Sequence, residues 1–285
     1  MYDLIISLTT IHSRVHTIHN VINSLLSQDS SLAFEVRLYI SEEPYLLDEG
    51  IKHIPSELQK LEENNGNKFR IIKTPNIGPY RKFLPLMKDY YDGVIDFSHF
   101  ITVDDDTVYP QGWLQRLLDE NIKLDCVVAY RGRQLQCSNL EILPYKKWVH
   151  SCLEVLTPDI RTVGTGKDGI IYRPEYFHPD VIDLDNALSV CNHADDLWLK
   201  VHTAVNGVRS VLLSESLSEA FEDLGSDDQN TLYKKINKHG GNDKAMKNIQ
   251  NYFMKRYDLN IIDVFSENLS LNSTWINPTF LRSYF

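Results

Sequence analysis

The chain has 285 residues, of which 42% are hydrophobic and 24% charged, and its formal net charge is −10 at pH 7. This composition is typical of a folded globular protein with a sizeable core, and it excludes a disordered chain. The negative charge argues against a nucleic-acid partner, because binding to a phosphate backbone needs a basic surface.

The first residues, "MYDLIISLTT", contain neither a basic segment nor a cleavage site, so we expect a β-strand here and not a signal peptide. No apolar run approaches the roughly 18 residues that span a bilayer. The four cysteines form no CxxC pair and no zinc-type spacing, which favours free thiols in a reducing compartment. We therefore expect a cytoplasmic protein.

Strand and helix patterns alternate along the first two thirds of the chain. Short β-rich runs predict strands at 4–10, 34–41, 68–74, 99–104 and 126–130. Helical patterns lie between them at 12–28, 56–64 and 112–122. This alternation predicts an α/β fold, with a mostly parallel sheet flanked by helices on both faces.

The character of the sequence changes near residue 217, where it becomes polar and helix-like. We therefore expect a nucleotide-binding and catalytic α/β domain over residues 1–215 and a C-terminal helical extension over residues 216–285.

Three consecutive aspartates, Asp104, Asp105 and Asp106, directly follow a predicted strand in "HFITVDDDTVYPQGWL". In an open parallel sheet, ligands bind beyond the carboxyl ends of the strands. Closely spaced carboxylates there suit Mg²⁺ or Mn²⁺, which would neutralise the charge of a departing diphosphate. The alternative is a solvated acidic turn.

Two further segments carry charges that fit such a site. In "NIGPYRKFLP", Gly78 begins a turn, after which Arg81 and Lys82 are placed to meet a phosphate or the aspartates. In "HADDLWLK", Asp195 and Asp196 would open a helix and could supply a general base. The alternatives are a plain turn for the first segment and helix capping for the second.

These segments together resemble the GT-A glycosyltransferases, in particular the family 2-like enzymes of bacterial polysaccharide (capsule or O-antigen) synthesis. "FITVDDDTVYPQGWLQRLL" is similar to the DxD region of that family, and "LIISLTTIHSRVHTIHNVINSLLSQD" to its first strand and helix. "NIGPYRKFLP" and "HADDLWLK" resemble its segment beneath the nucleotide and its acidic motif facing the acceptor. The resemblance covers about residues 3–215 in the family's order.

The resemblance implies a Rossmann-like GT-A fold and a role for each matching residue. Asp106 and Asp104 would hold Mn²⁺ or Mg²⁺, and Asp196, with Asp195 second, would be the catalytic base. The residues implied in binding the nucleotide sugar are Thr9, Arg14, Glu42, Asn76, Gly78, Lys82, Asp104 and Asp105. The family often has a base-reading aspartate after the second strand; "YISEEP" stands there instead, so Ser41, Glu42 or Glu43 would replace it. Neither His202 nor His239 is fixed by its surroundings as a further metal ligand.

The implied activity is a metal-dependent and inverting transfer of a hexose from a nucleotide-diphosphate sugar, expected to be a UDP-hexose. The acceptor would be a glycan or a lipid-linked oligosaccharide. Basic residues of the tail would allow peripheral contact with the inner membrane face, although a solvated helical face is the simpler explanation. The alternative functions are a sugar nucleotidyltransferase and a non-catalytic sugar-binding protein with the same fold. The first would need a glycine-rich basic loop, which "SLTTIHSRVH" lacks.

Overall fold

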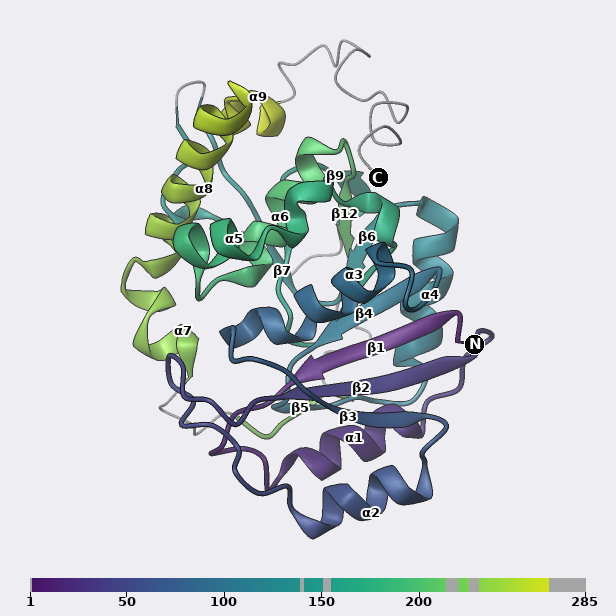
Figure 1. Cartoon of the computed structure of the whole chain (residues 1–285). Helices are drawn as coiled ribbons and strands as arrows, with labels where there is room; N and C mark the ends of the chain where they lie inside the picture. Colours follow the sequence, from purple (N-terminus) through teal and green to yellow (C-terminus); the bar gives the residue numbers. More distant parts are fainter. Residues whose placement is uncertain (1, 139–140, 151–154, 214–219, 226–230, 267–285) are drawn as a thin grey trace.

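The computed structural model describes residues 2–138, 141–150, 155–213, 220–225 and 231–266. Within them, eight strands form one central sheet in the order β3-β2-β1-β4-β11-β6-β12-β9 (Figure 1). The first four of these strands are mutually parallel, and β11 joins β4 and β6 in antiparallel pairing. The predicted α/β fold class, with a mostly parallel sheet flanked by helices, is confirmed.

The strands of this sheet are β1 (Leu4–Thr9), β2 (Phe34–Ile40), β3 (Phe69–Lys73), β4 (His99–Val103), β6 (Val127–Ala129), β9 (Val155–Asp159), β11 (Ile170–Tyr172) and β12 (Ser210–Leu212). The remaining strands are β5 (Thr107–Val108), β7 (Gly132–Gln134), β8 (Val149–His150), β10 (Thr162–Gly164) and β13 (Glu222–Asp223). Of these, β7, β8 and β10 form a small second sheet, and β13 pairs with β5.

The α-helices are α1 (Ile18–Leu26), α2 (Ser56–Asn64), α3 (Leu84–Tyr91), α4 (Trp113–Leu124), α5 (Leu184–Cys191), α6 (Asp195–Val205), α7 (Leu232–Lys235), α8 (Gly241–Tyr257) and α9 (Ile261–Phe265). Two 3₁₀ helices matter for the site, η1 (Gly78–Lys82) and η6 (Asn237–His239). No helix among the described residues is long and apolar enough to cross a membrane.

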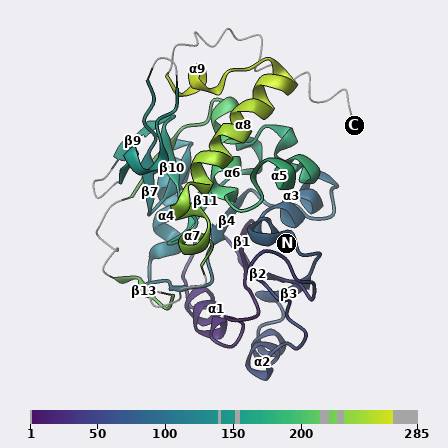
Figure 2. The ribbon, with the colours of Figure 1, turned by 90° about the vertical axis from the view of Figure 1, so that its left-hand side faces the viewer.

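Side chains of the central strands alternate between two apolar layers, because successive residues of a strand point to opposite faces. On β1, Leu4, Ile6 and Leu8 pack with α1, α2 and α4. Ile5 of the same strand and Phe100 of β4 pack with α3, α5, α6 and α8 on the other face. Figures 1 and 2 show the sheet between these two groups of helices.

The sequence patterns locate the five expected strands, but the first helix differs from the expectation. It begins at Ile18 instead of near residue 12, because residues 12–17 form turns. The small sheet of β7, β8 and β10 was not predicted, since its strands have only two or three residues each.

The described part of the C-terminal segment packs against the body of the molecule. Ile249 and Phe253 of α8 and Phe265 of α9 belong to the same buried cluster as Trp198 of α6. Figure 2 shows α8 crossing α5 and α6, with α7 at its lower end. The strand β13, which precedes these helices, returns to pair with β5 beside the three aspartates. The boundary near residue 215 remains a prediction.

Candidate active site

One cleft of about 520 Å³ opens where the carboxyl ends of β1, β2 and β4 meet. The three aspartates after β4 line it, together with Thr9, Arg14, Gly78, Lys82, Asp195 and Asp196. The fold therefore brings together segments that are more than 180 residues apart in the sequence, since Arg14 and Asp196 line the same cleft. Of the residues expected in the site, Glu42 and Asn76 do not line it.

The three aspartates have unequal surroundings. Asp105 is 4% exposed and accepts hydrogen bonds from the Arg14 Nε at 2.9 Å and the Thr10 Oγ1 at 2.6 Å. Asp104 accepts a hydrogen bond from the Lys82 Nζ at 2.7 Å. Asp106 forms no ion pair with any described residue. Asp105 thus helps to fix Arg14 in place, and Asp106 keeps its carboxylate available for a ligand.

The electrostatics of the cluster follow from these contacts. Burial, together with the charges of Asp104 and Asp105, raises the pKa of Asp106 to about 7. Burial also acts to raise the pKa of Asp104. The charge and hydrogen bond of Lys82, together with the charges of Arg14 and Lys167, outweigh this effect, so the pKa of Asp104 is lowered. An additional cation at Asp106 would therefore relieve an unfavourable charge.

Lys82 connects the aspartates after β4 with those at the start of α6. Its Nζ lies 2.7 Å from an Asp104 oxygen and 3.3 Å from an Asp195 oxygen, and its side chain is 5% exposed. Burial would lower the pKa of Lys82, but the three carboxylates nearby, Asp104, Asp195 and Asp196, raise it well above its usual value. The ammonium group therefore stays charged and holds the two acidic groups together.

Asp196 lies in the first turn of α6, where its Oδ2 accepts a hydrogen bond from the Gly166 N–H at 3.0 Å. Its other carboxylate oxygen, Oδ1, is buried without a hydrogen-bond partner. Burial raises the pKa of Asp196 to about 7, assisted by the charge of Asp195. Such a carboxylate can take up a proton near neutral pH, which is what a general base must do.

Two glycines allow loops to approach the carboxylates closely. A Cβ at Gly166 would lie 2.8 Å from the Lys82 Nζ and 2.9 Å from an Asp104 oxygen. A Cβ at Gly225 would lie 2.8 Å from the Asp106 Cβ. Any larger residue at either position would displace the acidic groups.

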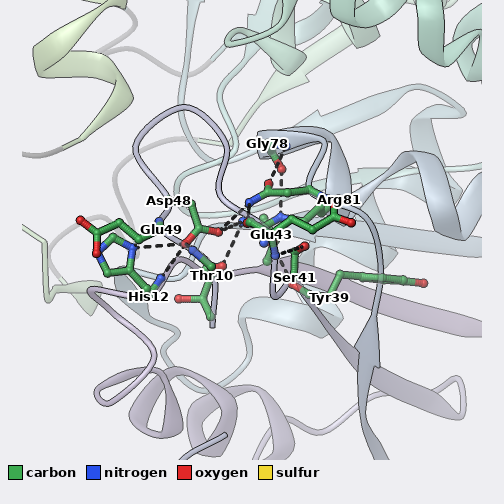
Figure 3. Close-up of polar contacts among 12 residues, drawn as sticks. Thr10, His12, Tyr39, Ser41, Glu43, Asp48, Glu49, Gly78 and Arg81 are labelled. Atoms are coloured by element: carbon green, nitrogen blue, oxygen red, sulfur yellow. Dashed lines mark hydrogen bonds and ion pairs between the residues drawn. The ribbon is translucent and has the colours of Figure 1, made fainter. Parts of the chain in front are cut away.

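A second polar network lies at the end of the cleft formed by β1 and η1 (Figure 3). The Arg81 Nη2 donates to the Thr10 carbonyl and lies 3.1 Å from the Asp48 Oδ2, while its Nε donates to the Gly78 carbonyl. Asp48 also accepts from the backbone N–H groups of His12 and Gly50. Arg81 is 1% exposed, and its Nη1 has no hydrogen-bond partner. Arg81 is therefore buried at the margin of the cleft with one donor left unpaired.

The acidic residue of this network is not the one expected from the sequence. The Glu42 side chain is 51% exposed and pairs with Lys73 at 2.7 Å, so it points away from the cleft. Asp48, six residues further on, lies inside because the loop after β2 folds back onto η1. Asn76 supports this loop from behind by donating to the Asp48 Oδ2 at 3.1 Å and to the Glu43 carbonyl at 2.7 Å. No local pattern marks Asp48, which is why the sequence analysis missed it.

The histidines considered as metal ligands lie elsewhere. His202 is fully buried between Trp198 and Phe253, and neither it nor His239 lines the cleft. Among the described residues, no group of three or more His, Cys, Asp and Glu side chains is arranged to hold a metal ion. Any divalent cation here would depend on Asp104 and Asp106 and on oxygens from a ligand.

No protein-family model and no curated protein sequence matches the chain. Among solved structures, the chain is similar to residues 1–349 of S. aureus TarS in complex with UDP-GlcNAc, at 15% identity and a TM-score of 0.48, covering 95% of this chain and 77% of that one. The complex with UDP gives 13% identity and a TM-score of 0.46 over the same shares. A longer TarS structure gives 17% identity and a TM-score of 0.46, covering 75% of this chain and 35% of that one. Similarity at this level indicates neither a shared family nor a shared activity.

Proposed function

We propose that the protein is a glycosyltransferase of the GT-A type, which transfers a hexose from a UDP-sugar to a hydroxyl group of a glycan acceptor. The observation that carries this proposal is the position of Lys82, whose ammonium group contacts both Asp104 and Asp195. This double contact joins the aspartates after β4, which would lie near the diphosphate, to the start of α6, which carries the potential base Asp196. A sugar placed between them would have its leaving group on one side and its attacking hydroxyl on the other.

The nucleobase end of the cleft supports uracil as the base. The unused Nη1 of Arg81 is a donor, and a buried donor is stabilised by an acceptor such as a carbonyl oxygen. Uracil presents a carbonyl oxygen at the position where cytosine presents an amino group. Asp48 already has five hydrogen bonds or ionic contacts, so its role in this proposal is to orient Arg81.

The residues present fit a divalent cation that arrives with the diphosphate. Asp106 has a raised pKa and no ion pair, and Asp104 lies two residues away. Mg²⁺ and Mn²⁺ are commonly held by one or two carboxylates together with substrate phosphates, so two protein ligands suffice. When bound, the cation would supply charge stabilisation for the departing diphosphate.

The proposed transfer is a single displacement with inversion at the anomeric carbon. Asp196 takes the proton of the acceptor hydroxyl, and the hydroxyl oxygen forms a bond to the anomeric carbon. The bond between this carbon and the diphosphate oxygen breaks, and UDP leaves with the electron pair. The positive charge that develops on the sugar ring is stabilised by the neighbouring carboxylates. Lys82 holds Asp195 and Asp104 in position during this step.

The proposal is tested by incubating the purified protein with a set of UDP-hexoses in Mn²⁺ and measuring UDP release and UDP binding. We expect UDP to bind, more strongly in Mn²⁺ than in EDTA, and at least one UDP-hexose to be slowly hydrolysed. Release of UMP and a sugar phosphate instead of UDP would indicate another reaction. No nucleotide turnover together with no metal-dependent UDP binding would refute the proposal.

A further inference from the structure

Arg133 of β7 brings a positive charge into the cleft that the proposed transfer does not use. Most of the other cations that line the cleft pair with acidic residues. The pairs are Arg14 with Asp105, Arg81 with Asp48, Lys82 with Asp104 and Asp195, Arg131 with Asp168, and Lys167 with Asp223. Arg133 is half-buried, and no acidic side chain among the described residues pairs with it. Its charge is therefore available to a ligand.

Aromatic packing fixes the position of the Arg133 guanidinium group. The group lies over the Tyr145 ring, with its central carbon 4.7 Å from the ring centroid. The Tyr145 ring packs on Trp148 with 4.8 Å between the ring centroids. Trp148 is 3% exposed and donates its Nε1–H to the Leu143 carbonyl. A stacked guanidinium keeps the N–H groups at its edge for a carboxylate or a phosphate, which it binds with two parallel hydrogen bonds. The side chain is thus held ready for an anion.

Arg133 lies away from the aspartates that would hold the diphosphate. It pairs with Val163 of β10, which precedes Gly166 by three residues, and the Gly166 N–H donates to the proposed base Asp196. At about 3.3 Å per residue, the backbone of Arg133 lies roughly 10 Å along the cleft wall from the segment that contacts the base. An anion at Arg133 is therefore separate from the diphosphate of the nucleotide.

Exposed lysines surround the outer end of the cleft beside Arg133. The backbone N–H of Tyr145 donates to Asp243 at 2.6 Å, which joins η2 (Tyr145–Lys147) to the start of α8, where Asn242 lines the cleft. Asp243 is the one acidic residue within residues 145–147 and 231–247. The exposed lysines of these two segments, here called the basic rim, are Lys146, Lys147, Lys235, Lys238, Lys244 and Lys247. The whole chain has a net charge of −10, so this concentration of positive charge is local.

From these observations we infer that the acceptor is an anionic glycan, which binds Arg133 through a phosphate or carboxylate group and continues along the basic rim. The inference rests on the proposed function, because it assigns the bound glycan as the acceptor whose hydroxyl reaches Asp196. An anionic membrane surface fits less well, since Arg133 lies inside the cleft and is half-buried. The positive field of the rim attracts a polyanion and increases its rate of association at low salt.

The test measures binding of defined oligosaccharides to the full-length protein by isothermal titration calorimetry, with and without UDP and Mn²⁺. The carboxylate probe is trigalacturonate, and its methyl ester is the neutral counterpart. The phosphate probe is maltotriose with a 6-phosphate on its terminal glucose, and maltotriose is its neutral counterpart. We expect at least one anionic probe to bind about tenfold or more tightly than its neutral counterpart. This preference should shrink between about 50 mM and about 300 mM NaCl, because salt screens the charges.

Arg133→Gln should reduce the affinity for that anionic probe about tenfold and leave the affinity for the neutral probe unchanged, because charge-assisted hydrogen bonds are lost. Arg133→Lys should lose less, since it keeps the charge but not the planar pair of donors. Arg70→Gln is the matched control, because it removes the same charge from an exposed arginine of β3 that does not line the cleft. Melting temperature and UDP affinity show whether each variant is folded.

If Arg133→Gln does not fold, substitution of the exposed rim keeps the inference testable. The double variant Lys146→Gln, Lys147→Gln should bind a six-residue form of the same anionic probe about threefold more weakly than the wild type. The effect on the three-residue form should be smaller, because a shorter chain contacts less of the rim. Equal binding of the longer probe by the variant and the wild type would overturn the assignment of the rim.

Three results would overturn the inference as a whole. They are neutral probes that bind as tightly as the anionic ones, a folded Arg133→Gln variant with wild-type affinity for the anionic probe, and binding to phosphatidylglycerol vesicles without binding to either anionic probe. The third result would identify the basic rim as a membrane-binding surface. A protein that binds UDP but no anionic probe would refute the inference alone. Binding of an anionic probe through Arg133 without binding of UDP would refute the proposed function and leave an anion site whose ligand is not an acceptor.

Discussion

Asp196→Asn separates the proposed chemistry of the cleft from its stability. The amide has nearly the same shape as the carboxylate and can still accept the hydrogen bond from the Gly166 N–H. It cannot take a proton from an acceptor hydroxyl, and it carries no charge. We therefore expect loss of transfer by a factor on the order of 10² or more, with UDP affinity retained.

The same substitution should stabilise the ligand-free protein above neutral pH. Burial and the charge of Asp195 raise the pKa of Asp196 from 3.8 to about 7. At about 1.4 kcal/mol per pKa unit, this interval sets a ceiling of roughly 4 kcal/mol on the cost of the buried charge. Relaxation and water entry reduce that cost, so we expect a gain of about 1–3 kcal/mol, or roughly 2–10 °C in melting temperature.

The sign of the pH dependence follows from the protons bound in each state. Between pH 4 and pH 7 the folded protein holds a proton on Asp196 that the unfolded chain has released. Raising the pH through this window therefore costs the wild type stability, and the cost is complete above pH 7. The advantage of Asp196→Asn should be largest at pH 8 and shrink as the pH falls toward 4.

Thermal unfolding at pH 8 and pH 5.5, together with transfer and UDP binding at pH 8, measures all of these quantities. Asp185→Asn serves as the control, because it removes an exposed carboxylate from the start of α5. A variant that melts at or below the wild-type temperature at pH 8 would refute the buried-charge argument. A variant that keeps transfer within tenfold of the wild type would refute the base assignment.

Four further substitutions test other parts of the cleft. Asp106→Ala should leave the fold intact and remove the difference between UDP affinity in Mn²⁺ and in EDTA; an unchanged difference would exclude Asp106 as a ligand. Arg81→Lys should reduce the preference for UDP over CDP in competition binding by about tenfold, because the Nη1 donor is lost, and an unchanged preference would contradict the base contact. Glu42→Ala should leave UDP affinity within twofold of the wild type, since this side chain pairs with Lys73 outside the cleft. A large loss of UDP affinity would show that Glu42 contacts the nucleotide. His202→Phe should diminish the loss of stability on acidification below pH 6.5. Burial holds the pKa of His202 well below its usual value, so only the unfolded chain takes up a proton there. Identical pH profiles of melting temperature for the variant and the wild type would show that His202 is not responsible.

The sequence by itself determined the elements that bear the chemistry. Apolar runs such as 99–103, followed at once by Asp104, Asp105 and Asp106, predict a buried strand with carboxylates at its end, and the structure has this arrangement. The pair Asp195 and Asp196 opens a helix as expected. These predictions succeed because strand period, helix period and turn chemistry are local properties of the chain.

Only the tertiary structure decided which charges meet. Lys82 contacts Asp104 and Asp195 because η1 packs beneath β1, where the Ser7 Oγ donates to the Lys82 carbonyl. Asp48 lies in the cleft in place of the expected Glu42 because the loop after β2 folds back onto η1. No periodic pattern in the sequence encodes the path of that loop. The contribution of Asn237 and Asn242 to the cleft depends likewise on the packing of α8 against α5 and α6. Contacts between distant segments are set by the sum of many weak packing interactions, which a local pattern does not contain.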